Sequence, residues 1–103
     1  MGWFYLVIAG FLEIAWAVGL KYSEGFSNLS ASIFTILGMI TSFYFLALAL
    51  KSIPLGTAYA VWTGIGTVGT AVFGIFLFDD PYSFSRLLCI LLIITGIVGL
   101  KLI

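Results

Sequence analysis

The stretch "LGTAYAVWTGIGTVGTAVFGIFLF" at residues 55–78 decides what kind of fold this chain can adopt. It contains no charged residue, and the sequence "DDP" at residues 79–81 ends it abruptly. A helix of about 20 apolar residues is long enough to cross the hydrocarbon core of a bilayer. Residues 55–78 therefore predict a membrane-spanning helix.

The composition of the whole chain has the same character. Of the 103 residues, 63% are hydrophobic and only 8% are charged, whereas a soluble domain carries about 25% charged residues. The formal net charge is zero, so there is no basic face for nucleic acid. There is no His, and Cys89 is the single Cys, which excludes zinc sites and disulfide frameworks. We expect an all-α membrane protein with no metal, cofactor or nucleic-acid partner, and not an enzyme.

Charged and turn residues divide the chain into four apolar segments, which we expect to form a single transmembrane domain at residues 1–103. Lys21 ends the first segment, and Pro54 separates the second from the third. Asp80, followed by Pro81, is expected to cap the start of the fourth helix. The predicted helices cover residues 2–21, 29–50, 55–78 and 83–102. Both termini and the second loop then lie on one side of the cell membrane, opposite the first and third loops.

The basic residues of the short loops and helix ends are divided equally between these two sides. Lys51 and Lys101 lie on the side of the termini, and Lys21 and Arg86 lie on the other. Because the excess of Lys and Arg in short loops sets orientation, an equal division favours insertion in both orientations. The count is thus compatible with an antiparallel, dual-topology homodimer. A single orientation fixed by subtler cues is the alternative.

Glu13 is the only ionisable residue in the middle of a predicted span. A carboxylate at that depth costs about 2.5–3.5 kcal/mol on insertion scales, so it normally faces a cavity or a partner. Gly10 and Trp16 lie on the same helix face, three residues to either side. Gly10 would leave room beside the carboxylate, and Trp16 would supply an aromatic wall and an N–H donor. The alternative is a protonated Glu13 that hydrogen-bonds to a neighbouring helix and serves packing alone.

Three further residues suit a site around this acid. Ser42 places a hydroxyl in the middle of the second span, and Tyr59 and Trp62 share one face of the third. Tyr59 and Trp62 are also near enough to a helix end to belong to an interfacial aromatic belt. Rings and a carboxylate together attract a small organic cation. Because a carboxylate that holds a proton has no charge left for a cation, such a site suits the exchange of protons for cations.

The sequence "GIGTVG" at residues 64–69 matches the glycine pattern of dinucleotide-binding folds, but its context is wrong. That fingerprint follows a strand and precedes an acidic residue about 20 positions later, whereas these glycines lie inside an apolar span. Gly64 and Gly66 instead predict a bend in the third helix. A bend in a helix that lines a transport pathway is a plausible hinge for alternating access.

With these residues in view, the chain closely resembles the small multidrug resistance family of proton-coupled exporters. The resemblance covers essentially the whole length and rests on Glu13, "KYSEGF" at residues 21–26 and "IPLGTAYAVWTGIG" at residues 53–66. The segment "LEIAWAVGLK" at residues 12–21 looks like the guanidinium-exporter subtype, which carries Trp three residues after the Glu. "GLK" at residues 99–101 is similar to that subtype as well.

The resemblance implies a homodimer in which both Glu13 residues share one central site, opened alternately to the two sides of the membrane. Carried over by position, Trp16, Ser42, Tyr59 and Trp62 would form the shell around Glu13, and Gly10 would make space in the pocket. The expected function is proton-coupled export of guanidinium and small guanidinyl cations.

Three alternatives to this function stay open. The first keeps the mechanism and changes the substrate to quaternary ammonium or aromatic cations. The second is a passive ion channel of dual topology, for which a carboxylate in the middle of the membrane is unfavourable when the ion is an anion. The third is an assembly subunit that works only beside a paralogous partner.

Overall fold

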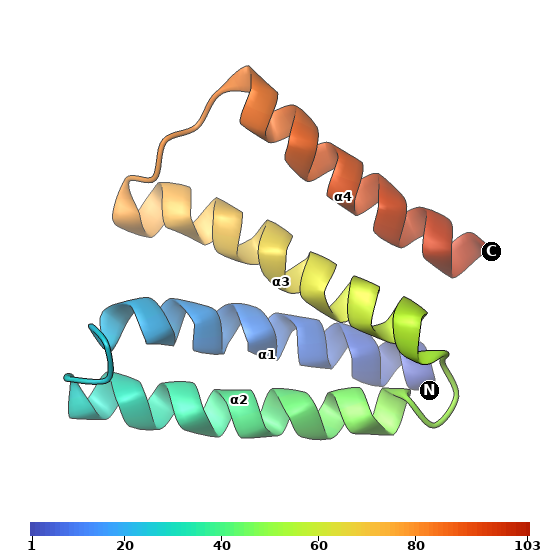
Figure 1. Cartoon of the computed structure of the whole chain (residues 1–103), viewed down its shortest axis with the longest axis horizontal. Coiled ribbons are helices and arrows are strands. Elements are labelled where there is room, and N and C mark those ends of the chain that lie inside the picture. Colours follow the sequence, from blue (N-terminus) through green and yellow to red (C-terminus); the bar gives the residue numbers. More distant parts are fainter.

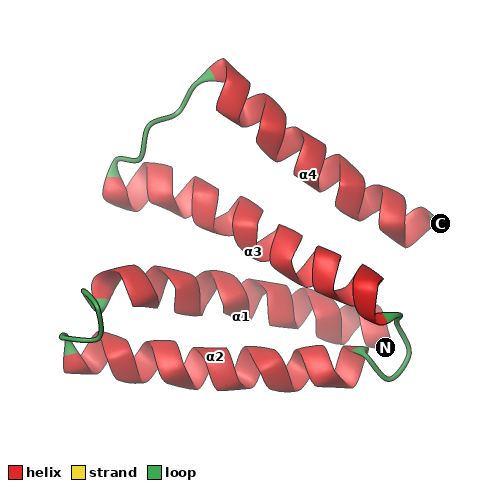
Figure 2. Cartoon of the chain, viewed as in Figure 1, coloured by secondary structure: helices red, strands yellow, loops and turns green.

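The computed structural model describes all 103 residues and contains four α-helices and no strand (Figures 1 and 2). The helices are α1 (Gly2–Tyr22), α2 (Leu29–Ala49), α3 (Leu55–Phe78) and α4 (Phe84–Leu102). Each is long and apolar enough to cross a membrane, which confirms the prediction of an all-helical chain with four spans. Both termini lie at the same end as the α2–α3 loop, and the other two loops lie at the opposite end (Figure 1).

The start of α4 differs from the prediction that Asp80 caps this helix. Ser83 is the N-cap, and its hydroxyl accepts a hydrogen bond from the backbone N–H of Arg86 at 3.2 Å. Asp80 belongs to the end of α3, where its backbone N–H donates to the carbonyl of Gly74 at 3.1 Å. This hydrogen bond folds the chain back onto the last turn of α3, after Asp79 in the left-handed conformation. Asp80 is therefore engaged before α4 begins.

Gly74 makes this helix end possible, because a Cβ atom at position 74 would collide with the Asp80 carboxylate. We expect Gly74→Ala to displace the exposed Asp80 carboxylate, so that this variant loses the gain of about 1 kcal/mol in helix propensity that an unobstructed Gly→Ala substitution brings to the detergent-solubilised protein. The measurement is the melting temperature. Gly96→Ala in α4 is the control, since a Cβ atom there meets no atom within 4 Å. Equal melting temperatures for the two variants would contradict this account of the loop.

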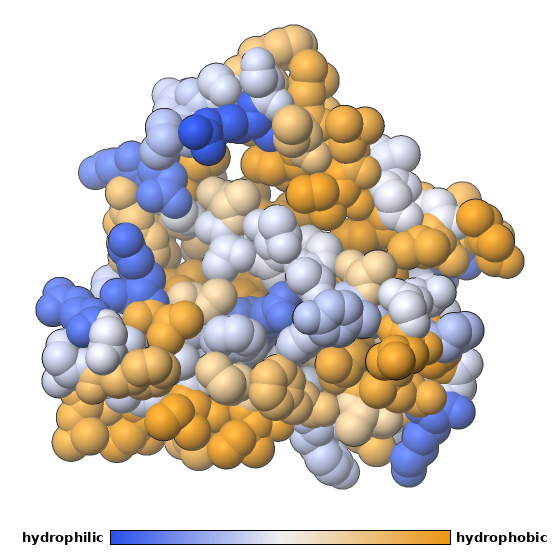
Figure 3. All heavy atoms as spheres, in the orientation of Figure 1, coloured by the Kyte–Doolittle hydropathy of each residue, from blue (hydrophilic) through white to orange (hydrophobic).

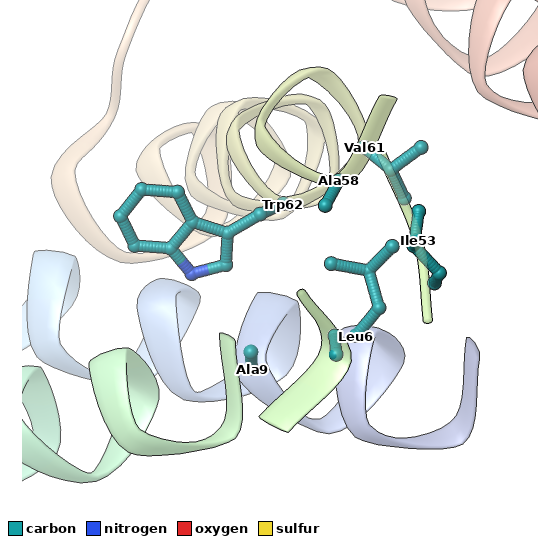
Figure 4. Close-up of a cluster of buried hydrophobic side chains, with 7 residues drawn as sticks. Leu6, Ala9, Ile53, Ala58, Val61 and Trp62 are labelled. Atoms are coloured by element: carbon teal, nitrogen blue, oxygen red, sulfur yellow. The ribbon is translucent and has the colours of Figure 1, made fainter. Parts of the chain in front are cut away.

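The helices do not all pack equally. α1 lies between α2 and α3 and contacts both, whereas the backbone of α4 packs against α3 (Figure 1). The one cation–π contact between α4 and α1 places Lys101 Nζ 5.5 Å from the centroid of the Trp3 ring. The apolar core lies where α1, the end of α2 and the first turns of α3 meet (Figure 4). Its buried members are Leu6, Ala9, Ala49, Ile53, Ala58, Val61 and Trp62. α4 contributes no buried residue at all.

Large apolar side chains cover much of the outside of the chain. Figure 3 shows hydrophobic residues over most of the visible face, with strongly hydrophilic residues gathered mainly near the loops at the helix ends. A soluble protein seldom exposes apolar patches of this extent. In a bilayer these faces meet lipid tails, and the polar ends meet headgroups and water.

Candidate functional site

Glu13 lies on the face of α1 that packs against α3, and it is half-buried there. Its carboxyl group sits directly on the backbone of Gly66 in α3. A Cβ atom at position 66 would overlap Glu13 Oε1 and would come within 2.9 Å of Glu13 Cγ. The one acid in the middle of a span is therefore accommodated by the absence of a side chain on the neighbouring helix.

Gly64 and Gly66, the residues of the predicted bend, lie within an uninterrupted helix from Leu55 to Phe78. Each of these two glycines leaves room for a side chain of another helix. A Cβ atom at Gly64 would lie 2.8 Å from Ile97 Cδ1 of α4, and the neighbour of Gly66 is Glu13. The bend stays a prediction, and the structure gives these glycines a role in close helix approach.

Gly10 brings α1 and α3 together one turn before Glu13. The space beside it is filled by Ile65, whose Cγ2 would be 2.7 Å from a Cβ atom at position 10. Small residues at such crossings let helix backbones approach closely in a membrane. The close approach at Gly10 and Ile65 explains how the Glu13 side chain reaches the backbone of Gly66.

Ser42 joins three helices through two hydrogen bonds. Its buried hydroxyl donates to the carbonyl of Ala9 in α1 at 2.8 Å and accepts from Trp62 Nε1 of α3 at 3.0 Å. The sequence indicated that Ser42 and Trp62 belong together, but it did not indicate Ala9. A hydroxyl in the middle of a membrane must find an acceptor, and nothing in a sequence shows which backbone carbonyl that will be.

Aromatic rings flank Trp62 on both sides. The ring centroids of Tyr59 and Phe43 each lie 5.6 Å from that of Trp62. Tyr59 is 55% exposed and Phe43 is 47% exposed, whereas Trp62 is buried and directs its indole nitrogen toward α1 and α2 (Figure 4). Phe43 was not among the predicted site residues, because it follows Ser42 directly and therefore occupies a different face of an ideal helix.

Trp16 holds an unsatisfied donor. Its Cβ would lie 3.0 Å from a Cβ atom at Gly38, so the side chain packs closely against α2. Its Nε1 is buried and has no hydrogen-bond partner. A guanidinium ion has donors only and cannot satisfy an N–H group, whereas a carboxylate oxygen can. Glu13, three residues earlier on the same face, carries the matching acceptor chemistry.

The site within one chain thus has two parts. Ser42, Trp62 and Tyr59 form a connected group that reaches back to α1 through Ala9. The second part is Glu13, which lies against Gly66. The hydrogen bonds of the candidate site are those of Ser42 with Ala9 and Trp62. No group of three or more His, Cys, Asp or Glu side chains could hold a metal ion.

The Ser42 hydrogen bonds lead to a prediction about stability. Ser42→Ala would leave Trp62 Nε1 without its acceptor in an apolar interior, at a cost of about 1–3 kcal/mol. We expect a lower melting temperature in detergent. Thr41→Val is the matched control, since the exposed Thr41 hydroxyl donates only to Leu37 within its own helix. A loss of stability as large in Thr41→Val as in Ser42→Ala would show that the link between helices is unimportant.

Comparison with known proteins shows which family the sequence belongs to. The family model described as "Small Multidrug Resistance protein" matches residues 1–93. A protein of Yersinia pseudotuberculosis serotype I (strain IP32953) is 59% identical over 102 residues, which are 99% of this chain and 98% of the relative. A protein of Proteus vulgaris is 56% identical over the same shares. One of Escherichia coli (strain K12) is 57% identical over 99% of this chain and 97% of its own length.

Each of these three relatives is named a guanidinium exporter. The residues that match each of these relatives include all four helices of this chain, and the residues that match the family model end within α4. The chain therefore belongs to the small multidrug resistance protein family.

Proposed function

We propose that this protein exports guanidinium and small guanidinyl cations in exchange for protons. The observation that carries the proposal is Glu13, the one acid in the middle of a span, in a chain 56–59% identical to proteins named guanidinium exporters. With four apolar helices, the chain is a multi-pass protein of the inner (cell) membrane, because outer-membrane proteins span as β-barrels.

Glu13 is proposed to bind either a proton or the cation. Guanidinium is planar, and its fork of N–H donors matches the two oxygens of a carboxylate. A protonated carboxyl group offers neither the charge nor the second acceptor. Proton and substrate therefore compete for the same two oxygens, and a carrier that exposes this site to one side at a time exchanges one for the other.

The remaining site residues are proposed to shape the space around this competition. Trp62 is held in place by Ser42, and its ring with that of Tyr59 supplies cation–π attraction. Trp16 Nε1 is proposed to donate to a Glu13 carboxylate during the cycle, because it is buried without a partner here. That N–H would occupy one lone pair of the carboxylate and leave the others for the N–H donors of the substrate.

The working unit is proposed to be an antiparallel homodimer of one four-helix transmembrane domain. Two features support this: the equal division of basic residues between the two ends, and the absence of any buried residue in α4. A Cβ atom at Gly96 or Gly99 in α4 would meet no atom within 4 Å, which leaves room for another helix. The bend at Gly64 and Gly66 is proposed to serve the change between the two open states.

A second substrate class has support from the ring exposure. Tyr59 and Phe43 present half-exposed rings on either side of Trp62. Quaternary ammonium and polyaromatic cations lack the N–H fork and bind through rings and charge. Export of such cations by the same mechanism is therefore the alternative function.

The test is electrical recording on proteoliposomes that contain only this protein. We expect a saturating, pH-dependent current with guanidinium and a much smaller one with tetraphenylphosphonium. A reversed preference would favour the alternative substrates. Fast flux without proton movement would indicate a channel, and an inactive pure chain that gains transport with a paralogue would indicate an assembly subunit. Either of these last two results would overturn the proposal.

A further inference from the structure

A large apolar groove lies on the opposite face of α1 from Glu13. It has a volume of about 920 Å³ and runs between α1, α2 and α3 toward the first loop. On α1 it is lined by Phe11, Ala15, Val18 and Tyr22, whose spacing of three and four residues makes one helix face. Phe34 of α2 and Phe73 of α3 form its sides. We call this space the outer groove.

The outer groove is separate from the candidate cation site. Ile14 packs onto the backbone of Gly69, where a Cβ atom would collide with its Cδ1, and both residues line the groove on the α3 side. The groove lining contains no ionisable group other than the Tyr22 phenol. It therefore suits a hydrocarbon chain and does not suit the head of an organic cation.

A polar pocket adjoins the groove at Tyr22, at the end of the helices. This second space, of about 620 Å³, shares Tyr22 with the groove and is also lined by Lys21, Glu24 and Phe78. Tyr22 and Phe78 pack with ring centroids 5.0 Å apart, and Lys21 Nζ lies 5.7 Å above the Phe78 ring. We call it the headgroup pocket, because it holds one cation and one anion at the mouth of an apolar groove.

The loop that supplies Glu24 has a fixed conformation. Glu24, Gly25 and Phe26 follow one another in the left-handed region, with φ of 49°, 74° and 67°. Ser23 is fully buried below them; its hydroxyl donates to Leu20 at 2.6 Å and accepts from the Phe26 N–H at 3.2 Å. A glutamate in the left-handed region is unfavourable and persists only where its surroundings hold it. The turn therefore fixes the backbone from which the exposed Glu24 side chain extends, at the pocket that Lys21 also lines.

We propose that the outer groove and the headgroup pocket together bind one zwitterionic phospholipid with a primary ammonium headgroup, of the phosphatidylethanolamine type. An acyl chain fills the groove, Lys21 faces the phosphate, and Glu24 faces the ammonium group. The paired charges match such a headgroup, whereas phosphatidylglycerol offers Glu24 only neutral hydroxyl groups in place of the ammonium charge. Phosphatidylcholine has the right net charge but no N–H donor for the Glu24 carboxylate, so it forms no charge-assisted hydrogen bond there.

The first test needs no variant. Purified full-length protein is mixed with equal amounts of phosphatidylethanolamine, phosphatidylcholine and phosphatidylglycerol of identical acyl chains, and the retained lipids are counted by native mass spectrometry. We expect phosphatidylethanolamine to exceed each of the others by about three- to tenfold, the range that one charge-assisted hydrogen bond at a wet interface supplies. Equal retention of the three lipids would overturn the proposal.

Substitutions in the headgroup pocket test the binding of the lipid headgroup separately from that of the acyl chain. Glu24→Gln should bring the ratio of phosphatidylethanolamine to phosphatidylcholine close to one, while Lys21→Gln should lower retention of all three lipids. Lys51→Gln, at the other end of the helices, is the control for Lys21 and should match the wild-type protein. A wild-type ratio in Glu24→Gln would contradict the assignment of Glu24 to the ammonium group.

The groove itself is tested by filling it. Ala15→Leu places a larger side chain on the groove floor and should reduce retention of all three lipids severalfold. Ala47→Leu adds the same atoms at an exposed position of α2 outside the groove and should have no effect. If Ala15→Leu changes the oligomeric state and leaves lipid retention intact, the groove is a contact between copies of this chain, and the lipid proposal fails.

Discussion

Replacement of Glu13 by Gln is expected to abolish the proton-coupled transport of guanidinium. Gln has nearly the shape of Glu, so the packing against Gly66 can be kept. The Gln amide cannot take up or release a proton in this pH range, and it carries no charge to pair with guanidinium. Removing one partner of a buried charge pair costs about 2–5 kcal/mol. Since 1.4 kcal/mol corresponds to a factor of ten, binding should weaken by about 30- to 4,000-fold. Guanidinium currents in proteoliposomes should therefore fall to the level of empty liposomes.

A matched control tests whether the loss comes from the position of the acid. Asp79→Asn makes the same change from carboxyl to amide outside the membrane spans, at a residue with φ of 53°. Asn tolerates this left-handed conformation well, so we expect wild-type currents. Coupled transport that survives in Glu13→Gln would remove the mechanism proposed for this site, whatever the behaviour of Asp79→Asn.

Gly66→Ala is expected to have the second-largest effect on transport. The new methyl group would overlap Glu13 Oε1, so the carboxylate has to move from its place beside α3. Ala is about 1 kcal/mol better than Gly in a helix interior, so helix propensity alone would favour the variant. We expect guanidinium transport to fall at least about tenfold, the effect of losing one well-placed hydrogen bond to a charged group. The measurement is the initial rate of guanidinium-driven current at saturating substrate.

Two further variants make this test specific. Gly56→Ala adds a methyl group to the same helix where no atom lies within 4 Å, and it should transport like the wild type. In the double variant Gly66→Ala/Glu13→Asp, the shorter acid withdraws from the new methyl group. The two substitutions should therefore cost less together than the sum of their separate effects. Additive losses would mean that Gly66 acts without touching Glu13.

The outline of the fold could be predicted because membranes leave few choices. Every backbone polar group in a bilayer must be satisfied internally, so apolar segments of this length become helices. Charged residues and Pro54 then mark where the segments end. The N-cap of α4 was mispredicted because both Asp80 and Ser83 are residue types that suit this position. Asp80 and Pro81 fit a helix start by type, but Ser83 caps α4, and the backbone N–H of Asp80 donates to the carbonyl of Gly74 at the end of α3.

The sequence proposes the members of the candidate site, which stay a prediction, and it leaves their contacts open. Glu13 stood out because no other ionisable residue lies in mid-span. The contact of Gly66 with Glu13 did not stand out, since a glycine in a helix is equally consistent with a bend and with close approach. The acceptor at Ala9 is a backbone carbonyl, which every residue has. Contacts between helices such as these depend on how each helix is rotated about its own axis. The pattern of apolar residues along the sequence does not determine that rotation.

The two hydrogen bonds of Ser42 have a mechanical consequence. They tie the backbone of α1 to the indole of Trp62 in α3 through a side chain of α2, so none of these helices can shift there without carrying the other two. The part of α3 beyond Trp62 lies outside this tie, and α4 packs mainly on α3, with Lys101 Nζ 5.5 Å from the Trp3 ring centroid as a contact to α1. We therefore expect α1, α2 and the first half of α3 to turn as one rigid body during the cycle. The second half of α3 and α4 would form the arm on which that body pivots.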